Sequence, residues 1–371
     1  MKRLNTYLLS LLCLAFVSAH AANVQEQVFY YTSLTPQGDT ITLSGKISVP
    51  RSCTPKGIIL LPHFTVSGNH EVPSTSTITE SKWFRDDYIL LMPDYLGYGI
   101  TRDKVHPYLR GDLVARHCVD MLVQACDSVL NDLCIRADTN LPELPLYIVG
   151  FSEGAASALW TLRLLEKDYP HVKIAGCFAG SGPYDVAATY DECVAKNRNG
   201  MPMAIPMLVM GTSESYGLNL RRSDFFTPEM DGCYDAYITS KEYSYVSLYF
   251  LMTSRKVSHW LTASGMDKRQ AQTRRMYDGF LRSSLVHFPL ADDIYRDDPD
   301  APGKDTIIPD WQPKAPVYIF HSYDDDIVCF SNCAHLEKCW HDLPNVTFET
   351  GYFGGHLRSI FAFMKRMKKK L

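Results

Sequence analysis

One pentapeptide, Gly150-Phe151-Ser152-Glu153-Gly154, constrains the fold more than any other part of the sequence. An apolar, strand-like run (146–149) precedes it, and a helix-like run (155–165) follows it. A serine on so tight a strand-to-helix turn is forced into a strained backbone conformation, and only glycine at the flanking positions leaves room for it. The turn raises the hydroxyl above the sheet, close to the free N–H groups that begin the helix. The pattern predicts Ser152 as a nucleophile, the alternative being an ordinary glycine-rich turn.

Short apolar runs alternate with helix-like periodicity along most of the chain. One helical pattern covers residues 113–129, and strand-like runs lie on either side of it. Such alternation is typical of a mostly parallel sheet with helices on both faces. Near the start, β-rich runs at 28–33 and 40–49 flank a turn and predict an antiparallel hairpin. The other predicted strands are 57–61, 88–92, 146–149, 172–178, 317–320 and 346–349, and a closing helix is predicted over 357–370.

The alternation stops between about residues 190 and 310 and then resumes. The interrupted stretch is rich in Tyr, Met and charged residues. We therefore predict a core of residues 22–189 and 311–371, with residues 190–310 inserted as a largely helical cap over the carboxyl ends of the strands. The aromatic residues of the cap, Tyr245 and Tyr249 among them, either line a pocket over the predicted nucleophile or form the core of the cap itself.

A serine nucleophile needs a base, and the base needs an acid to orient it. In sheets of this kind the three residues follow one another along the chain as serine, acid and histidine. Candidate acids lie in the segment His321–Val328, directly after a predicted strand, where parallel sheets carry functional residues. His356 is the candidate base because it follows both and comes directly after the last predicted strand. Gly354 and Gly355 precede it and allow the loop to bend back over the sheet.

The motifs together resemble the α/β-hydrolase superfamily, above all its secreted lipases and esterases, with a weaker likeness to prolyl-oligopeptidase-type enzymes. The resemblance covers roughly residues 55–190 and 315–371 and implies the α/β-hydrolase fold. Besides the serine motif, it is carried by His321–Val328 (similar to H-G-x-x-D-[DE]-x-V), by Pro93–Gly99 with His106–Leu109 (P-D-Y-x-G-x-G…H-P-Y-L), and by His63–Thr65 with Val72–Ser74 (H-G-T…V-P-S).

The resemblance also implies roles for individual residues. It places the family's aspartate on Asp325, with Asp324 as the alternative because Ser322 stands where the family usually has glycine. The backbone N–H directly after the nucleophile, that of Glu153, is expected as one donor of an oxyanion hole. By resemblance the second donor is the N–H of Thr65, but Phe64 replaces the family's glycine and could shift that donor by one residue.

Residues 1–21 have the features of a secretory signal peptide: two basic residues, an apolar run over 7–17, and a Ser-Ala-His-Ala ending. The apolar run is shorter than the roughly 20 residues that a membrane span needs. No later run approaches that length, so we expect a secreted or periplasmic protein without a stable membrane span, the alternative being a retained anchor. An exported chain can form disulfides, and one to three are expected. The cysteines after the signal peptide are Cys53, Cys118, Cys126, Cys134, Cys177, Cys193, Cys233, Cys329, Cys333 and Cys339, and their pairing is left open.

Composition excludes several other functions. The formal net charge of -4 argues against a nucleic-acid partner, which usually requires a basic surface. We expect neither a cofactor nor a metal. The acidic segment near Asp298 and Asp300 suggests a calcium loop, but Pro302 and Pro309 stand where oxygen ligands are needed.

The sequence thus predicts an exported serine hydrolase that cleaves small-molecule carboxylic esters through Ser152, Asp325 and His356 and an acyl-enzyme. One alternative is a serine peptidase of the oligopeptidase type, although the chain before the first core strand is too short for a propeller domain. Another is a catalytically inactive hydrolase-fold protein that only binds a ligand, against which the full set of candidate catalytic residues argues. The acyl group, the alcohol and the oligomeric state remain open.

Overall fold

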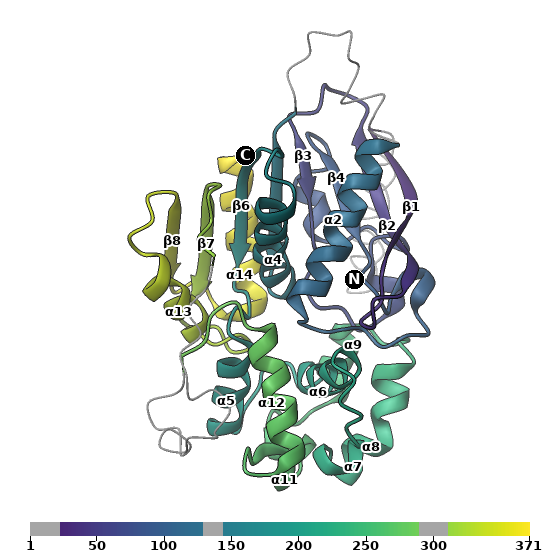
Figure 1. Cartoon of the computed structure of the whole chain (residues 1–371), viewed down its shortest axis with the longest axis vertical. Coiled ribbons are helices and arrows are strands. Elements are labelled where there is room, and N and C mark those ends of the chain that lie inside the picture. The colour runs from purple at the N-terminus through teal and green to yellow at the C-terminus, as the bar shows by residue number, and fades with distance from the viewer. Residues whose placement is uncertain (1–22, 129–143, 289–310) are drawn as a thin grey trace, which may run out of the picture.

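A single eight-stranded sheet runs through the computed structural model, which describes residues 23–128, 144–288 and 311–371. The predicted signal peptide, Cys134 and the acidic segment at 291–310 lie outside the described residues. The strand order is β1-β2-β4-β3-β5-β6-β7-β8 (Figure 1). The bounds are β1 Val24–Leu34, β2 Thr40–Pro50, β3 Ile58–Leu60, β4 Ile89–Pro93, β5 Leu146–Phe151, β6 Ile174–Gly180, β7 Val317–Ser322 and β8 Val346–Gly351.

The sheet is antiparallel at one edge and parallel elsewhere. β1 and β2 form the expected hairpin, β2 also pairs antiparallel with β4, and the strands from β4 to β8 pair in parallel. Every residue of β4 and β7 is buried, because helices cover both faces of this part of the sheet. Continuous apolar runs are what such doubly covered strands require, and this is why they were visible in the sequence.

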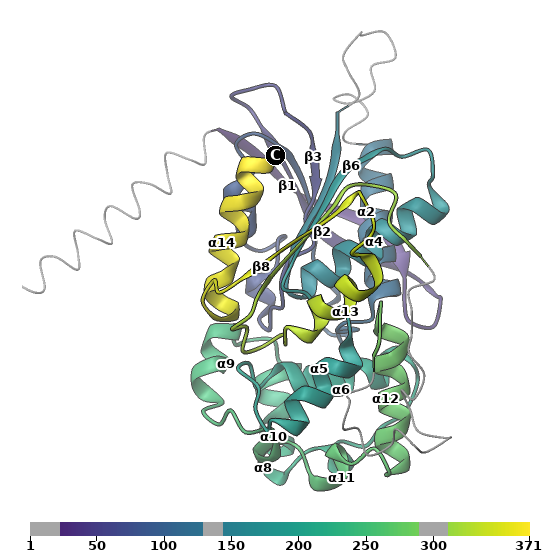
Figure 2. The same cartoon turned by 90° about the vertical axis from the view of Figure 1, so that its left-hand side faces the viewer.

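Helices of the core pack on the two faces of the sheet. α2 and α4 lie on one face together with α13, and α14 lies on the other (Figure 2). Leu159 and Trp340 belong to the hydrophobic cluster of the first face, and Phe320 and Phe363 to that of the second. The helices of the core are α2 Gly111–Asp127, α4 Glu153–Asp168, α13 Ser331–Trp340 and α14 Gly355–Lys370, with short turns η1 Asn69–Glu71, η2 Glu80–Trp83 and η3 Gly99–Thr101.

Between β6 and β7 the described residues form helices and no strand of the sheet. These helices gather at one end of the sheet (Figures 1 and 2) and share a hydrophobic cluster of their own, which includes Phe225, Trp260 and Phe280. Their bounds are α5 Val186–Ala195, α6 Ala204–Ser215, α7 Arg222–Phe225, α8 Pro228–Tyr234, η4 Asp235–Thr239, α9 Tyr245–Leu251, α10 Val257–Trp260, α11 Ala263–Met266 and α12 Ala271–Ser283.

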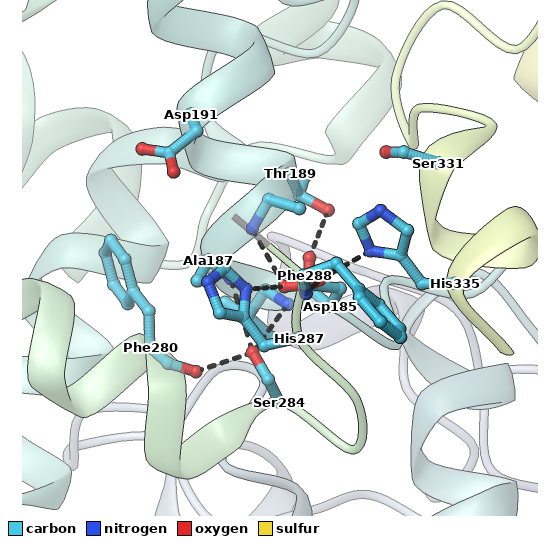
Figure 3. Close-up of polar contacts among 12 residues, drawn as sticks. Asp185, Ala187, Thr189, Asp191, Phe280, Ser284, His287, Phe288, Ser331 and His335 are labelled. Atoms are coloured by element: carbon cyan, nitrogen blue, oxygen red, sulfur yellow. Dashed lines mark hydrogen bonds and ion pairs between the residues drawn. The ribbon is translucent and has the colours of Figure 1, made fainter. Parts of the chain in front are cut away.

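The two ends of this helical segment meet at Asp185, a fully buried carboxylate (Figure 3). Its side chain caps α5 by accepting a hydrogen bond from the N–H of Ala188. Nδ1 of His287, just after α12, lies 2.9 Å from one carboxylate oxygen, and Nδ1 of His335, on α13, lies 2.7 Å from the other. Burial alone would raise the pKa of Asp185, but the hydrogen bonds from both histidines outweigh it and hold the pKa below its usual value. One carboxylate thus ties the start and the end of the helical segment to the core.

The structure shows several cysteines with free thiols, so none of these forms one of the expected disulfides. Burial raises the pKa of the thiols of Cys118 and Cys177, which behave as small apolar side chains of the sheet's core. The free thiols are those of Cys53, Cys118, Cys177, Cys193, Cys233, Cys329, Cys333 and Cys339. Among the described residues, no helix has both the length and the apolar character needed to cross a bilayer.

Candidate active site

Ser152 occupies the sharp turn between β5 and α4. Its φ angle of 56° lies in the left-handed region, which a residue with a side chain rarely adopts. A Cβ atom on Gly150 would lie 2.0 Å from the carbonyl oxygen of Gly154, and one on Gly154 would lie 2.2 Å from that of Pro62. Both glycines are therefore required by close backbone contacts, and the turn holds the serine hydroxyl above the end of the sheet.

His356, the second residue of α14, lies against this hydroxyl. Its Nε2 atom is 2.8 Å from Oγ of Ser152, and its Nδ1 atom is 2.7 Å from Oδ2 of Asp325. The side chains of His356 and Asp325 are almost completely buried. Gly354, before the helix, has a φ angle of 87°, so the sharp bend expected ahead of the histidine is present. The structure thus brings together the three residues that the sequence predicted to act together.

Asp325 is held by more than the histidine. Its Oδ1 atom accepts hydrogen bonds from the backbone N–H groups of Ile327, at 3.0 Å, and Val328, at 2.8 Å. Burial by itself would raise the pKa of Asp325, but the charge and the hydrogen bond of His356 lower it below its usual value. The carboxylate is therefore ionised and points its free lone pairs at the imidazole.

Asp324, the alternative acid, has a different position. It is exposed and accepts a hydrogen bond from Oγ of Ser322 and another from the N–H of Gly354. Oγ of Ser322 also accepts a hydrogen bond from the N–H of Phe353. Ser322, which departs from the family's glycine, therefore fastens the end of β7 to the loop that leads to His356.

The loop after β3 carries Thr65 and lies beside the serine. The N–H of the preceding Phe64 donates to Oε1 of Glu80 at 3.1 Å, so this N–H is already occupied. Oγ1 of Thr65 lies 2.9 Å from the hydroxyl of Tyr108. Of the two neighbouring candidates for the second oxyanion donor, Thr65 is the one that the hydrogen bonds of this loop favour.

Glu80 and Tyr108 are contacts of this loop for which sequence reasoning proposed no role. Burial raises the pKa of Glu80 to about 7, against an ordinary value of 4.5. Tyr108 lies in the His106–Leu109 motif, so its hydroxyl could have been suspected from sequence, whereas nothing in the sequence around Glu80 marks it. Glu80 contacts the backbone of Phe64, sixteen residues earlier in the chain, and this contact forms only in the folded protein.

The segment 241–245 fastens the helical segment to the loop that follows Thr65. The carbonyl of Lys241 accepts from the N–H of Asn69, and the carbonyl of Tyr243 accepts from the hydroxyl of Ser67. The N–H of Tyr245 donates to Oε2 of Glu71 at 3.0 Å. Nζ of Lys241 donates to backbone carbonyl groups of the 97–104 turn, including that of Arg102 at 2.9 Å.

Two apolar cavities meet at Ser152, and both are also lined by Thr65 and Met201. The smaller one, of about 40 Å³, lies under α5 and α6, where Tyr190 and Leu208 line it. The larger one, of about 120 Å³, is lined by His356, Leu357, Phe361 and Tyr245. Tyr249 lines neither cavity; its ring instead packs against the guanidinium of Arg255, 3.9 Å away.

Nothing in the described part of the chain groups three or more His, Cys, Asp or Glu side chains in a way that could hold a metal ion. The acidic segment near Asp298 and Asp300 lies outside that part.

The strand order, the antiparallel edge and the serine turn after β5 define an α/β-hydrolase fold, as the sequence predicted. No protein-family model matches the chain. Solved structures of hydrolases share the fold. The rice cell wall degrading esterase LipA of Xanthomonas oryzae aligns with a TM-score of 0.72 over 93% of this chain and 88% of its own, at 18% identity. Candida antarctica lipase A in its closed state aligns with a TM-score of 0.64 over 94% and 79%, at 16% identity.

A relative among curated proteins is similar in sequence as well. It is a secreted triacylglycerol lipase of Malassezia restricta, 23% identical over 304 residues, which make up 77% of this chain and 55% of the relative. The chain therefore spans about half the length of this relative. The chain is similar to lipases and esterases in both comparisons.

Proposed function

We propose that this protein is a serine hydrolase that cleaves carboxylic esters, with Ser152 as nucleophile, His356 as general base and acid, and Asp325 as the residue that orients the imidazole. The observation that carries the proposal is the unbroken chain of hydrogen-bond distances, 2.8 Å from Ser152 to His356 and 2.7 Å from His356 to Asp325. Similarity to a secreted lipase and to esterases of the same fold supports ester substrates.

In the acylation step, Oγ of Ser152 attacks the ester carbonyl carbon while its proton passes to Nε2 of His356. Asp325 accepts the Nδ1–H of the imidazole and stabilises the positive charge that it gains. The carbonyl oxygen becomes negatively charged and is stabilised by the N–H groups of Glu153 and Thr65, each typically worth roughly 2.7–4 kcal/mol. His356 then returns the proton to the departing alcohol, which leaves an acyl-enzyme. A water molecule hydrolyses this ester by the same steps.

We assign the two cavities to the two halves of the substrate on the basis of the position of His356. Because His356 protonates the leaving alcohol, the alcohol lies in the larger cavity, which His356 lines. The acyl chain is left with the smaller cavity of about 40 Å³. A water molecule needs roughly 10–15 Å³ of such space, so this cavity accepts a short acyl chain of a few carbons. We therefore propose short-chain acyl esters of apolar alcohols as substrates.

In this proposal the described part of the predicted insert at residues 190–310 acts as the cap that walls the acyl cavity, since Leu208 and other residues of α6 line it. The protein acts outside the cytoplasm, where the signal-peptide pattern of residues 1–21 would direct it. The secreted relative is consistent with this location.

A panel of p-nitrophenyl esters of rising acyl length, run beside peptide amides, tests the proposed activity. We expect hydrolysis of the acetyl and butyryl esters, a steep fall in kcat/KM for long acyl chains, and no cleavage of the amides. Amide cleavage would instead favour a peptidase, and inactivity toward the whole panel would favour a binding protein.

A further inference from the structure

A buried pair of a histidine and a carboxyl group lies directly behind the proposed nucleophile. The side chain of Glu153, the residue after Ser152, meets His106, with Oε1 and Nε2 2.7 Å apart. The two side chains are only 2% and 4% exposed, respectively. His106 opens the His106–Leu109 motif, and its ring lies within 6.0 Å of the rings of Tyr95, Tyr98 and Tyr108. The proposed mechanism uses the backbone of Glu153 and gives its carboxyl group no role.

The second nitrogen of His106 fixes where the protons are. Nδ1 lies 2.8 Å from the carbonyl oxygen of Leu96, which can only accept a hydrogen bond, so Nδ1 carries a hydrogen. The contact between Nε2 and Oε1 then needs one further proton. If that proton is on Nε2, the pair is an imidazolium and a carboxylate; if it is on Oε1, both groups are neutral. The net charge of the pair is zero in both arrangements.

This neutrality matters because of where the pair lies. The N–H of Glu153 is one of the two proposed donors to the oxygen that becomes negatively charged. A lone carboxylate on the same residue, shielded from water, would repel that charge, and charges interact strongly where water is excluded. Other titratable groups of the described structure that interact electrostatically with Glu153 include His63, Tyr95, Tyr98, Tyr108 and Cys118. Burial lowers the pKa of His63 and raises those of the tyrosines and the thiol, so burial favours the neutral form of each and none supplies a positive charge in place of His106.

We propose that His106 is a positioning residue that shares a single proton with the side chain of Glu153, so that the residue bearing the oxyanion-hole N–H stays electrically neutral during catalysis. The inference rests on the proposed ester hydrolysis. It also explains why position 106 is a histidine: a phenylalanine in the same aromatic site could not donate a proton to Glu153, and a tyrosine could donate a hydrogen bond but would leave the pair with a net negative charge.

The test compares the pH dependence of kcat/KM for the parent, His106→Phe and the double variant His106→Phe/Glu153→Gln, with p-nitrophenyl butyrate as substrate. His106→Phe keeps a ring in place but removes the proton, so Glu153 must take up a proton of its own or remain charged. We expect the ratio of kcat/KM in this variant to kcat/KM in the double variant to fall as the pH rises, and kcat/KM of this variant at pH 8 to be at least about tenfold below the parent, less than the ~10²–10³ for losing an oxyanion donor. The double variant has no carboxyl group to ionise, so it should regain most of the loss.

His117→Phe is the matched control. His117 is also fully buried and also bonds a backbone carbonyl, that of Leu34, but it has no carboxylate partner in the described structure. This variant should be less stable than the parent but should not show a fall in kcat/KM relative to the parent at high pH.

If His106→Phe does not fold, His106→Gln replaces it in the test. Glutamine can donate a hydrogen bond but cannot share a mobile proton, so the corresponding ratio for this variant should show the same fall. Identical pH profiles for each His106 variant and its double variant with Glu153→Gln would overturn the inference and leave the pair a purely structural contact. If the parent protein itself does not hydrolyse p-nitrophenyl butyrate, the proposed function is rejected instead.

Discussion

The Nδ1 atom of His356 lies 2.7 Å from Asp325, whereas the neighbouring Asp324 contacts Ser322 and the N–H of Gly354. Adjacent carboxylates thus have different partners. Asp325→Asn should lower kcat by about 10⁴, because the imidazole loses the group that holds its tautomer and stabilises its charge, while Asp324→Asn should lower kcat by about tenfold or less. Steady-state kinetics on one ester, with circular dichroism to verify folding, measures both. A larger loss for Asp324→Asn would reject the role proposed for Asp325.

Glu80 should make the stability of the protein depend on pH. Its folded-state pKa is about 7, above the ordinary value of 4.5, so its contribution is fully present below pH 4.5 and is lost as the pH rises through about 7. Glu80→Gln removes this titration. The melting temperature of the variant relative to the parent should therefore increase from pH 5 to pH 8, as measured by thermal unfolding. Glu214→Gln, at an exposed carboxyl, is the control and should show no such trend. A constant difference for Glu80→Gln would contradict the raised pKa.

Asp185 should show the opposite dependence on pH. Its pKa is held below the usual value, so its contribution to stability is present above that value and is lost as the pH falls through the folded-state pKa. Asp185→Asn leaves the hydrogen bonds of His287 and His335 weakened in a buried site and should cost about 1–3 kcal/mol in urea unfolding at pH 7. The cost should shrink in acid, where the parent also loses its charge. Asp342→Asn, at a side chain 89% exposed, should change stability little. Equal costs for the two variants would show that the buried carboxylate does not hold the helical segment in place.

The two cavities should respond separately to substitution. Leu208→Ala enlarges the smaller cavity and should move the preferred acyl chain toward longer esters. Tyr245→Ala enlarges the cavity beside His356 and should instead change the preference among alcohols. The measurement is kcat/KM over a matrix of acyl and alcohol groups, and Tyr249→Ala, outside both cavities, is the control. If Leu208→Ala altered alcohol preference and left acyl preference unchanged, the assignment of the cavities would be reversed.

Local patterns predicted most of the fold because they are local in origin. Doubly covered strands such as β4 must be apolar throughout, and the turn at Ser152 must have glycine at 150 and 154 to avoid backbone atoms. The positions of Ser152, Asp325 and His356 after their strands follow from the same rules. The boundaries differ by a few residues, as with β5, which extends to Phe151.

Features that depend on contacts between distant segments could not be predicted in this way. Glu80 reaches the loop at Phe64, and Lys241 reaches the 97–104 turn, through contacts that no periodicity encodes. His106 was visible as part of a motif, but its partner Glu153 is 47 residues away, and only the folded chain brings them together. Disulfide pairing also depends on contacts between distant segments: Cys118 and Cys177 are free thiols buried in the core, and Cys134 lies outside the described residues.

Ser152 should form a covalent acyl-enzyme, and covalent labelling of its hydroxyl shows whether it is an activated nucleophile. A fluorophosphonate probe, which loses fluoride as its phosphorus bonds to an activated serine oxygen, should add its mass to the peptide that contains Ser152. Peptide mass spectrometry should find no labelled peptide in Ser152→Ala and a greatly reduced yield in His356→Ala, because the hydroxyl is then not activated. Labelling of Ser152→Ala to the same extent as the parent would show that the nucleophile is another residue.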